Sequence, residues 1–298
     1  MLDLDYLQRL RDKYADEFAS KVHNFELRSK HFEFDVRPHT MGVINLSADS
    51  WYRETVSLSL DSALQRGRTL MAHGADLIDI GAESTLAHAA RVDQVTQQSK
   101  LLPLITTLSE EGARISVETY HPSVTEAALD EGACVLNLTG TENLEEHFKI
   151  VADYGAAVII CYVQGTNVRE VADFEFAEDI VSSMYEWFGP KVALAEKCGV
   201  KKIFIDPGLG FYYQNLQDSA VRVRHQMEVF LNTFRLRKLG WPTCHALPHA
   251  FEYFREEVRC AEPFMAVLAL LGKTDLIRTH ELPRINAVIE TLRVFSAK

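Results

Sequence analysis

Short apolar runs alternate with longer amphipathic stretches from about residue 41 to the end of the chain. The runs are rich in Val, Ile and Leu, which is typical of buried strands. Most stretches between them have apolar residues at helical spacing, as in residues 59–74 and 123–132. The eight runs are MGVINLS (41–47), ADLIDIG (75–81), RISVET (114–119), CVLNLTG (134–140), AVIICYV (157–163), KIFIDPG (202–208), PTCHAL (242–247) and LIRTH (276–280). Such an alternation of strands and helices predicts a parallel sheet covered by helices.

The unbroken rhythm of eight strand-like units favours a closed barrel, so the sequence predicts an α/β fold of the (β/α)8 TIM-barrel class. An open α/β sheet is the alternative. The GxGxxG motif of dinucleotide-binding sheets does not follow the first run, which argues against that class. No Gly/Ser-rich linker interrupts residues 41–298, and we therefore expect them to form one barrel domain.

Residues 1–40 have a different pattern. Leu4, Leu7, Leu10 and Tyr14 recur at helical spacing among charged residues, which predicts an N-terminal helical extension over residues 1–40. We expect it to pack on the barrel or on a second subunit. The segment lacks the continuous apolar core of a secretory signal or a membrane span.

The charge balance excludes some classes of partner. The 298 residues include 42 acidic and 31 basic side chains, for a formal charge of −11. Because phosphate binding requires a basic face, this argues against a general nucleic-acid or anionic-membrane surface. The five cysteines form no CxxC pair and lie mostly in or beside apolar runs, so we expect buried thiols. Together these features predict a protein of the reduced cytoplasm.

Polar side chains stand at the ends of the predicted strands, where βα barrels carry their catalytic groups. Asn137 and Asp206 each follow apolar residues and require a hydrogen-bonding partner once desolvated. A heterocycle with several N–H donors suits a carboxylate and an amide; a structural role for Asp206 before Pro207 is the alternative. The other polar strand ends are Asn45, Asp79, Glu118, Gln164, His245, His249, Arg278 and His280.

Seven segments, taken in order, resemble the successive motifs of dihydropteroate synthases over residues 41–290. They are MGVINLSADSW, GADLIDIGAEST, ISVETY, LNLTG, VQGT, IDPGLGF and RTH. The resemblance implies a pterin-binding TIM barrel that condenses 6-hydroxymethyl-dihydropterin pyrophosphate with p-aminobenzoate or a related arylamine and releases pyrophosphate. It also implies a homodimer, because members of the family are usually dimers.

The resemblance assigns roles by position. Asp206 would accept hydrogen bonds from the pterin amino and ring N–H groups, and Asn137 would pair with another ring edge. Glu118 stands where the family has an aspartate, and Gln164 belongs with these pterin-binding residues. Asn45 would reach Mg²⁺ and the pyrophosphate.

Other positions would serve the leaving group and the second substrate. Arg278 with His280 would hold the phosphate oxygens, a role that suits the charge-assisted bonds of a guanidinium. The loops that would meet the phosphate and the second substrate contribute Ser84, Thr85, Arg53 and His249.

The chain departs from the family pattern on one side of the expected site. Leu86 replaces an arginine that would meet the anion, with Arg53 or Arg91 as the candidate substitute. Residues 246–251 lack the family's lysine, and His249 or His245 is the candidate donor there. The ring site is thus retained beside an altered phosphate and arylamine site. Two alternatives follow: a methyltransferase that uses a methyl-folate and a corrinoid partner, and a non-catalytic pterin-binding relative.

Overall fold

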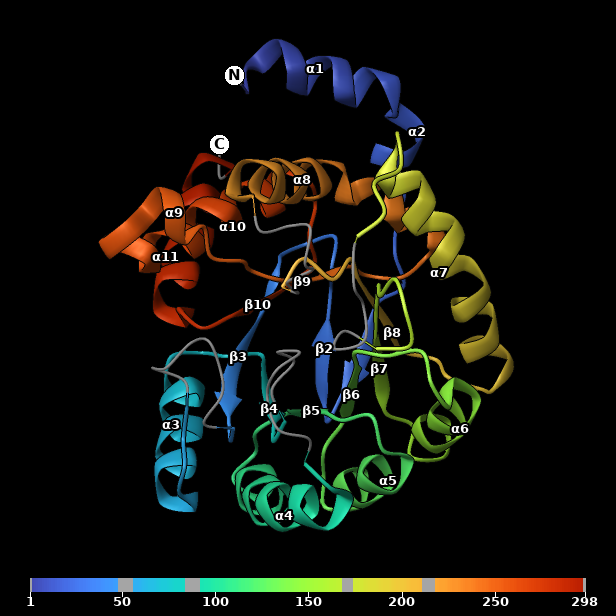
Figure 1. Ribbon diagram of the computed structural model, residues 1–298, viewed down its shortest axis with the longest axis vertical. Coiled ribbons are helices and arrows are strands. Elements are labelled where there is room, and N and C mark those ends of the chain that lie inside the picture. The colour runs from blue at the N-terminus through green and yellow to red at the C-terminus, as the bar shows by residue number, and fades with distance from the viewer. Residues whose placement is uncertain (1, 48–55, 84–91, 168–173, 211–217, 297–298) are drawn as a thin grey trace.

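Eight parallel strands form a barrel at the centre of the computed structural model, which describes residues 2–47, 56–83, 92–167, 174–210 and 218–296 (Figure 1). The strands are β3 (His39–Asn45), β4 (Leu77–Gly81), β5 (Ile115–Glu118), β6 (Val135–Leu138), β7 (Ala157–Cys161), β8 (Ile203–Asp206), β9 (Cys244–Ala246) and β10 (Leu276–Thr279). They are paired in the order β8-β7-β6-β5-β4-β3-β10-β9, and a bridge between Ile205 and Thr243 joins β8 to β9. The (β/α)8 prediction is confirmed, because each of the eight apolar runs overlaps one strand of the barrel.

The strands are apolar because both of their faces are covered. All five residues of β4 and all five of β7 are buried, between the barrel interior and the surrounding helices. The helices are α3 (Leu60–Ala72), α4 (Gln94–Glu110), α5 (Pro122–Asp130), α6 (Leu144–Asp153), α7 (Ile180–Lys197), α8 (Ser219–Asn232), α9 (Phe251–Phe254), α10 (Ala261–Leu271) and α11 (Leu282–Ser296). Figure 1 shows α3 to α7 around the lower and right sides of the barrel and α8 to α11 at the upper left.

The N-terminal region is helical only in its first part. Helices α1 (Leu4–Lys13) and α2 (Ala15–Phe18) confirm the predicted helical extension there. Residues 25–32 instead form an antiparallel hairpin of β1 (Phe25–Leu27) and β2 (Lys30–Phe32), so the helical prediction is wrong for them. Arg28 and Ser29 both have positive φ, as in a two-residue hairpin turn of type I′.

The hairpin closes the N-terminal end of the barrel. Phe25 and Phe34 each meet the ring of Phe204 edge-on. Their ring centroids lie 5.2 and 5.6 Å, respectively, from that of Phe204. Asp76, just before β4, accepts hydrogen bonds from Lys30 and from the backbone N–H of Thr40. This end of the barrel is therefore filled by aromatic rings and fastened by a buried carboxylate.

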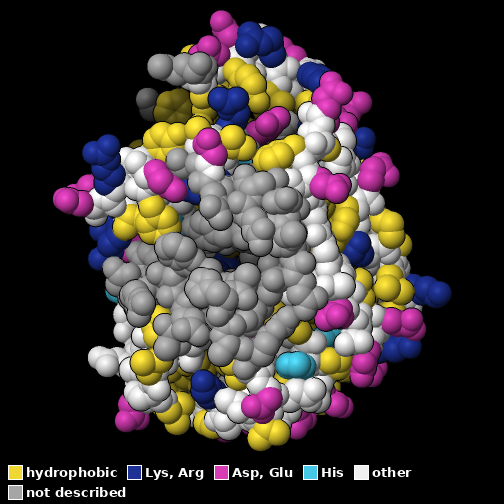
Figure 2. All heavy atoms as spheres, viewed as in Figure 1, with side chains coloured by type: hydrophobic (Ala, Val, Ile, Leu, Met, Phe, Trp, Pro, Cys, Tyr) yellow, Lys and Arg dark blue, Asp and Glu magenta, His cyan; other side chains and the backbone are white. Residues whose placement is uncertain are grey.

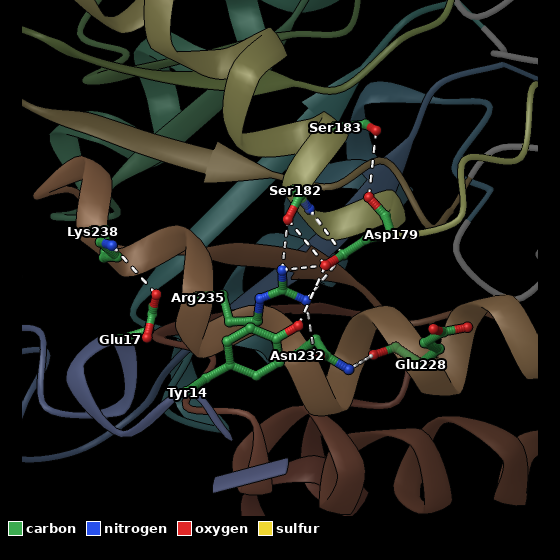
Figure 3. A network of polar contacts seen from close by, with 9 residues as sticks. All are labelled: Tyr14, Glu17, Asp179, Ser182, Ser183, Glu228, Asn232, Arg235 and Lys238. Carbon is green, nitrogen blue, oxygen red and sulfur yellow. Dashed lines mark hydrogen bonds and ion pairs between the residues drawn. The ribbon is translucent and has the colours of Figure 1, made fainter. Parts of the chain in front are cut away.

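A polar network holds the two N-terminal helices against the barrel (Figure 3). Arg235, in the 3₁₀ helix Thr233–Leu239, donates to both carboxylate oxygens of Asp179, at 3.0 and 2.6 Å. The Tyr14 hydroxyl donates to Asp179 Oδ2 at 3.4 Å, and the Arg235 guanidinium lies 4.0 Å from the centroid of the Tyr14 ring. Asp179 also caps α7 by accepting from the backbone N–H of Ser182. The arm formed by α1 and α2 is thus anchored at the start of α7.

The surface seen in Figure 2 has mixed charge. Lys and Arg side chains of the described residues are interspersed there with Asp and Glu, without a continuous basic area. None of the helices in the described ranges has the length and apolar character needed to cross a membrane.

Candidate functional site

Polar side chains meet at the C-terminal end of the barrel because the strand register brings them side by side. Asn45 pairs with Gly81, Gly81 with Glu118, and Glu118 with Asn137 across four neighbouring strands. Of the polar strand ends predicted from the sequence, Glu118 and Asn137 therefore lie side by side, and Asn45 lies at the same level on the far side of Gly81.

Asp79, in the middle of β4, is the centre of the hydrogen-bond network. Its carboxylate is fully buried and accepts from Arg278 Nε at 2.7 Å, Ser116 Oγ at 2.6 Å and Asn137 Nδ2 at 3.2 Å. Three donors satisfy the buried charge, which would otherwise be costly. Sequence reasoning named Asp79 as a polar strand end but gave it no role. The available signal was a carboxylate inside the apolar run LIDIG.

Glu118 faces the same guanidinium from the next strand. Arg278 Nη2 lies 3.6 Å from Glu118 Oε2, and Thr139 Oγ1 donates to Glu118 Oε1 at 3.3 Å. Burial raises the pKa of Glu118 to about 7; Arg278 opposes this rise and the charge of Asp79 adds to it. Glu118 is thus able to gain or lose a proton near neutral pH.

Asp206 ends β8 because Pro207 has no N–H for the ladder. The backbone N–H of Gly208 donates to Asp206 Oδ1 at 2.8 Å, and its φ of +75° suits glycine at this turn. Burial raises the pKa of Asp206 to about 6, against the opposing effects of the Gly208 N–H and of Arg278. Asp206 therefore makes the structural turn contact that was the alternative to a binding role. Its carboxylate is also buried at the site.

The carboxylates of Asp79 and Glu118 lie within 4 Å of the Arg278 guanidinium, and that charge also opposes the rise in the pKa of Asp206 without a direct contact. A buried site with more carboxylates than cations holds protons on some of them or binds groups that donate hydrogen bonds. A flat heterocycle with several N–H donors meets this requirement.

The carboxylate of Glu262 holds the segment that follows β10. Glu262, fully buried on α10, accepts from the Thr279 hydroxyl and from the backbone N–H of His280, the latter at 3.1 Å. Its Oε1 lies 3.2 Å from Nε2 of His249, and the rings of His249 and His280 have centroids 5.8 Å apart. Burial, with Arg278 nearby, lowers the pKa of His280 well below its usual range. His249 and His280 thus lie together, and sequence reasoning missed the Glu262 that holds them.

Two predicted candidates have contacts of another kind. Gln164 accepts from the backbone N–H of Glu175 at 2.6 Å and donates to its carbonyl at 2.9 Å, so it braces the segment before α7. His245 lies on the outer side of β9, where its Nε2 is 2.7 Å from Thr233 Oγ1. His245 is therefore not a donor at the barrel mouth.

The remaining predicted site residues do not take part in these two networks as far as the structure describes them. Arg53, Ser84, Thr85 and Arg91 lie outside the described residues. Asn45 is half-buried at the end of β3. Within the described ranges, no three His, Cys, Asp or Glu side chains form a group that could hold a metal ion.

Comparison with known proteins gives one consistent relationship. Residues 41–243 match the family model described as pterin binding enzyme. The folate synthesis bifunctional protein of Arabidopsis thaliana is 31% identical over 231 residues, which are 74% of this chain and 45% of that protein. The type-2 dihydropteroate synthase of Escherichia coli is 27% identical over 273 residues, 85% of this chain and 97% of that one.

Comparison of the fold with solved structures gives the same result. A dihydropteroate synthase of Xanthomonas albilineans, solved with 4-aminobenzoic acid, superposes with a TM-score of 0.77 at 24% identity, over 92% of this chain and 98% of that one. The bifunctional relatives are longer, and this chain spans less than half of the length of each of them.

Proposed function

Since this chain belongs to the pterin-binding enzyme family, to which residues 41–243 match, we propose that it condenses 6-hydroxymethyl-dihydropterin pyrophosphate with p-aminobenzoate or a related arylamine. The observation that carries the proposal is the buried Asp206 beside the Asp79, Asn137 and Arg278 network. This arrangement offers acceptors for the N–H groups of a pterin, in a place where an unpaired carboxylate is costly.

The ring is the part of the substrate that these residues hold. Asp206, once ionised, accepts hydrogen bonds from the pterin amino group and a ring N–H. Asn137 pairs with another edge, and Glu118 stands between Asn137 and Arg278. Charge-assisted bonds of this kind are shorter and stronger than neutral ones and fix the orientation of the ring.

The bond chemistry then requires positioning and charge stabilisation. The C–O bond of the substrate breaks and its electron pair leaves with pyrophosphate, while the amine nitrogen forms the new C–N bond and releases a proton. Arg278 carries five N–H donors, so it can keep its bond to Asp79 and still contact an anion. His280, two residues beyond Arg278, is neutral at pH 7 and donates without adding charge.

Mg²⁺ is the cofactor that fits the leaving group. Asn45 offers one oxygen ligand at the end of β3, and the described residues hold no acidic cluster that would bind the ion alone. Mg²⁺ is commonly bound through few protein oxygens together with substrate phosphates. Asn45 would therefore hold the ion together with pyrophosphate oxygens, and the ion would neutralise part of the charge of the leaving group.

The second-substrate side is the altered one. Arg53, Ser84 and Thr85 are proposed for the loops that meet phosphate and amine, and His249, held by Glu262, takes the place at the seventh strand where the lysine is missing. Gln164 is still proposed for the ring site, where it would act indirectly by holding the backbone segment at Glu175.

We also propose a homodimer in the reduced cytoplasm, with residues 41–298 as the barrel domain and residues 1–40 as its extension. Exposed apolar side chains on α10 and α11, namely Phe264, Leu271 and Phe295, offer area for a second copy. All five cysteines are free thiols. Sedimentation of the full chain would test the oligomeric state.

The activity is tested with the full chain, the dihydropterin pyrophosphate, p-aminobenzoate and Mg²⁺. We expect pyrophosphate release that stops when the ion is chelated, and that Asp206→Asn lowers strongly. Asp153→Asn, at an exposed carboxylate on α6, is the matched control. Pterin binding without pyrophosphate release would replace the proposal with the non-catalytic alternative, and methyl transfer to a corrinoid protein would replace it with the methyltransferase.

A further inference from the structure

The side-chain amide of Asn137 has a different partner at each end. Its Nδ2 donates to Asp79, at 3.2 Å from Oδ2 and 3.4 Å from Oδ1. Its Oδ1 accepts from the thiol of Cys161, with the sulfur 3.6 Å away. An acceptor-only carboxylate on one side and a thiol donor on the other distinguish the nitrogen of the amide from its oxygen. The orientation of Asn137 is therefore set by Asp79 and Cys161 together.

Cys161 lies where it can influence the ring site. It is the last residue of β7, is buried, and pairs directly with Asp206 across β7 and β8. Burial, with Asp206 nearby, raises the pKa of the Cys161 thiol well above its usual range, so the sulfur keeps its proton and acts as a donor. The thiol of Cys244 is also buried, and the nearby charge of Asp206 adds to burial in raising its pKa well above its usual range.

We propose that Cys161 is a positioning residue for ring binding, because its thiol, together with Asp79, holds the Asn137 amide in one orientation and so fixes where Oδ1 and Nδ2 lie at the ring site. The inference rests on the proposed function and deepens it. An amide that is held in one orientation discriminates between ring edges that carry a donor and edges that carry an acceptor. An amide that can rotate by about 180° would bind either kind of ring edge.

Cys134 provides a matched control within the same chain. Its thiol is also buried and donates to a backbone carbonyl, that of Ile115, with the sulfur 3.6 Å away. Cys134 immediately precedes β6 and therefore lies at the N-terminal end of the barrel, opposite the site. Cys134→Ala and Cys161→Ala each remove one thiol bond of the same length from the barrel wall, but only Cys161→Ala touches the ring site.

The experiment measures the affinity of the full chain for pterin-6-carboxylate by titration calorimetry, with thermal unfolding alongside. We expect Cys161→Ala to weaken binding about 3- to 10-fold, the range of one modest hydrogen bond. Cys134→Ala should change affinity less than 2-fold although both variants unfold at similarly lower temperatures. Cys161→Ser, which keeps a donor, should recover part of the loss. In an Asn137→Ala background, Cys161→Ala should have no further effect on affinity.

Two results would overturn the inference. One is an equal change in affinity for the two cysteine variants. The other is a Cys161→Ala effect that persists without the Asn137 amide. The NMR signals of the Asn137 side-chain NH₂ decide the same question without a ligand, because they should move in Cys161→Ala and stay in place in Cys134→Ala. If the wild type binds no pterin, the proposed function fails, and these signals alone decide the role of Cys161.

Discussion

The carboxylate of Asp79 lies 2.7 Å from Nε of Arg278, and this pair links β4 to β10 through the interior of the barrel. Asp79 is fully buried, and the Arg278 side chain is 17% exposed. Such a pair is costly to break because removing one partner leaves the other charge buried and unpaired.

We therefore expect Arg278→Met to lower the free energy of unfolding by about 3–5 kcal/mol, as measured in urea. The control is the exposed pair of Arg68 and Glu111, which has a similar separation of 2.6 Å. Arg68→Met should cost less than about 1 kcal/mol, since surface pairs contribute little. Equal costs for the two variants would contradict the central role of the Asp79 and Arg278 pair.

The pH dependence of stability should depend on Glu118 and Asp206. Burial raises both pKa values, to about 7 and about 6, so the native state binds more protons than the unfolded state between pH 5 and 8. Their contribution to stability is complete below the unfolded pKa values and is lost as the pH rises through the native ones. Buried histidines such as His147, whose pKa is lowered by burial, oppose this slope below about pH 6.5.

The comparison is therefore made between proteins at each pH. We expect Glu118→Gln/Asp206→Asn to gain on the order of 4 kcal/mol relative to the wild type as the pH rises from 5 to 8, measured by urea unfolding. Parallel stability curves for the two proteins would show that neither carboxyl holds a proton in the native state.

Ring binding should have the opposite pH dependence. Asp206 accepts two N–H groups only when it is ionised, so affinity for a pterin should rise between pH 5 and 7, through the pKa of about 6. Asp206→Asn should remove this rise and weaken binding at pH 7 by roughly 2–3 kcal/mol, the upper range for a hydrogen bond to a charged group. Calorimetry at several pH values measures both effects, and an unchanged slope in the variant would assign the titration to another group.

The N-terminal arm should contribute to stability through Asp179. Asp179→Ala removes both the cap of α7 and the contacts with Tyr14 and Arg235. Asp93→Ala is the matched control, since Asp93 caps α4, forms no ion pair with any residue in the described ranges, and a cap alone contributes about 1 kcal/mol. We expect the larger loss for Asp179→Ala, together with faster proteolysis within residues 4–18. Equal losses and equal cleavage would mean that the arm is held by other contacts.

The eight barrel strands could be predicted because each is a buried apolar run bounded by turn residues, and Asp206 and Asn137 stood out as polar residues in such runs. The family resemblance inferred from the seven motifs is confirmed by the match over residues 41–243. The hairpin of residues 25–32 was missed because strands of three residues leave too short a pattern beside an amphipathic helix.

Cross-strand contacts could not be predicted from a single chain. The sequence placed Asp79, Cys161 and Arg278 on separate strands, but only the fold shows that the first and third form a pair and that the second holds Asn137. Glu262 was missed for a similar reason, since it lies on an apolar helix whose register against β10 the sequence does not give.

The phenylalanine-filled floor formed by the hairpin has a kinetic consequence. With Phe25, Phe32 and Phe34 packed at the N-terminal end, we expect the inner carboxylates to exchange protons with solvent at the opposite end of the barrel, where the proposed ring site lies. Substrate entry and proton exchange would then share one route. A bound ring should therefore block proton exchange between bulk solvent and the carboxyl groups of Asp206 and Glu118 until the ring dissociates.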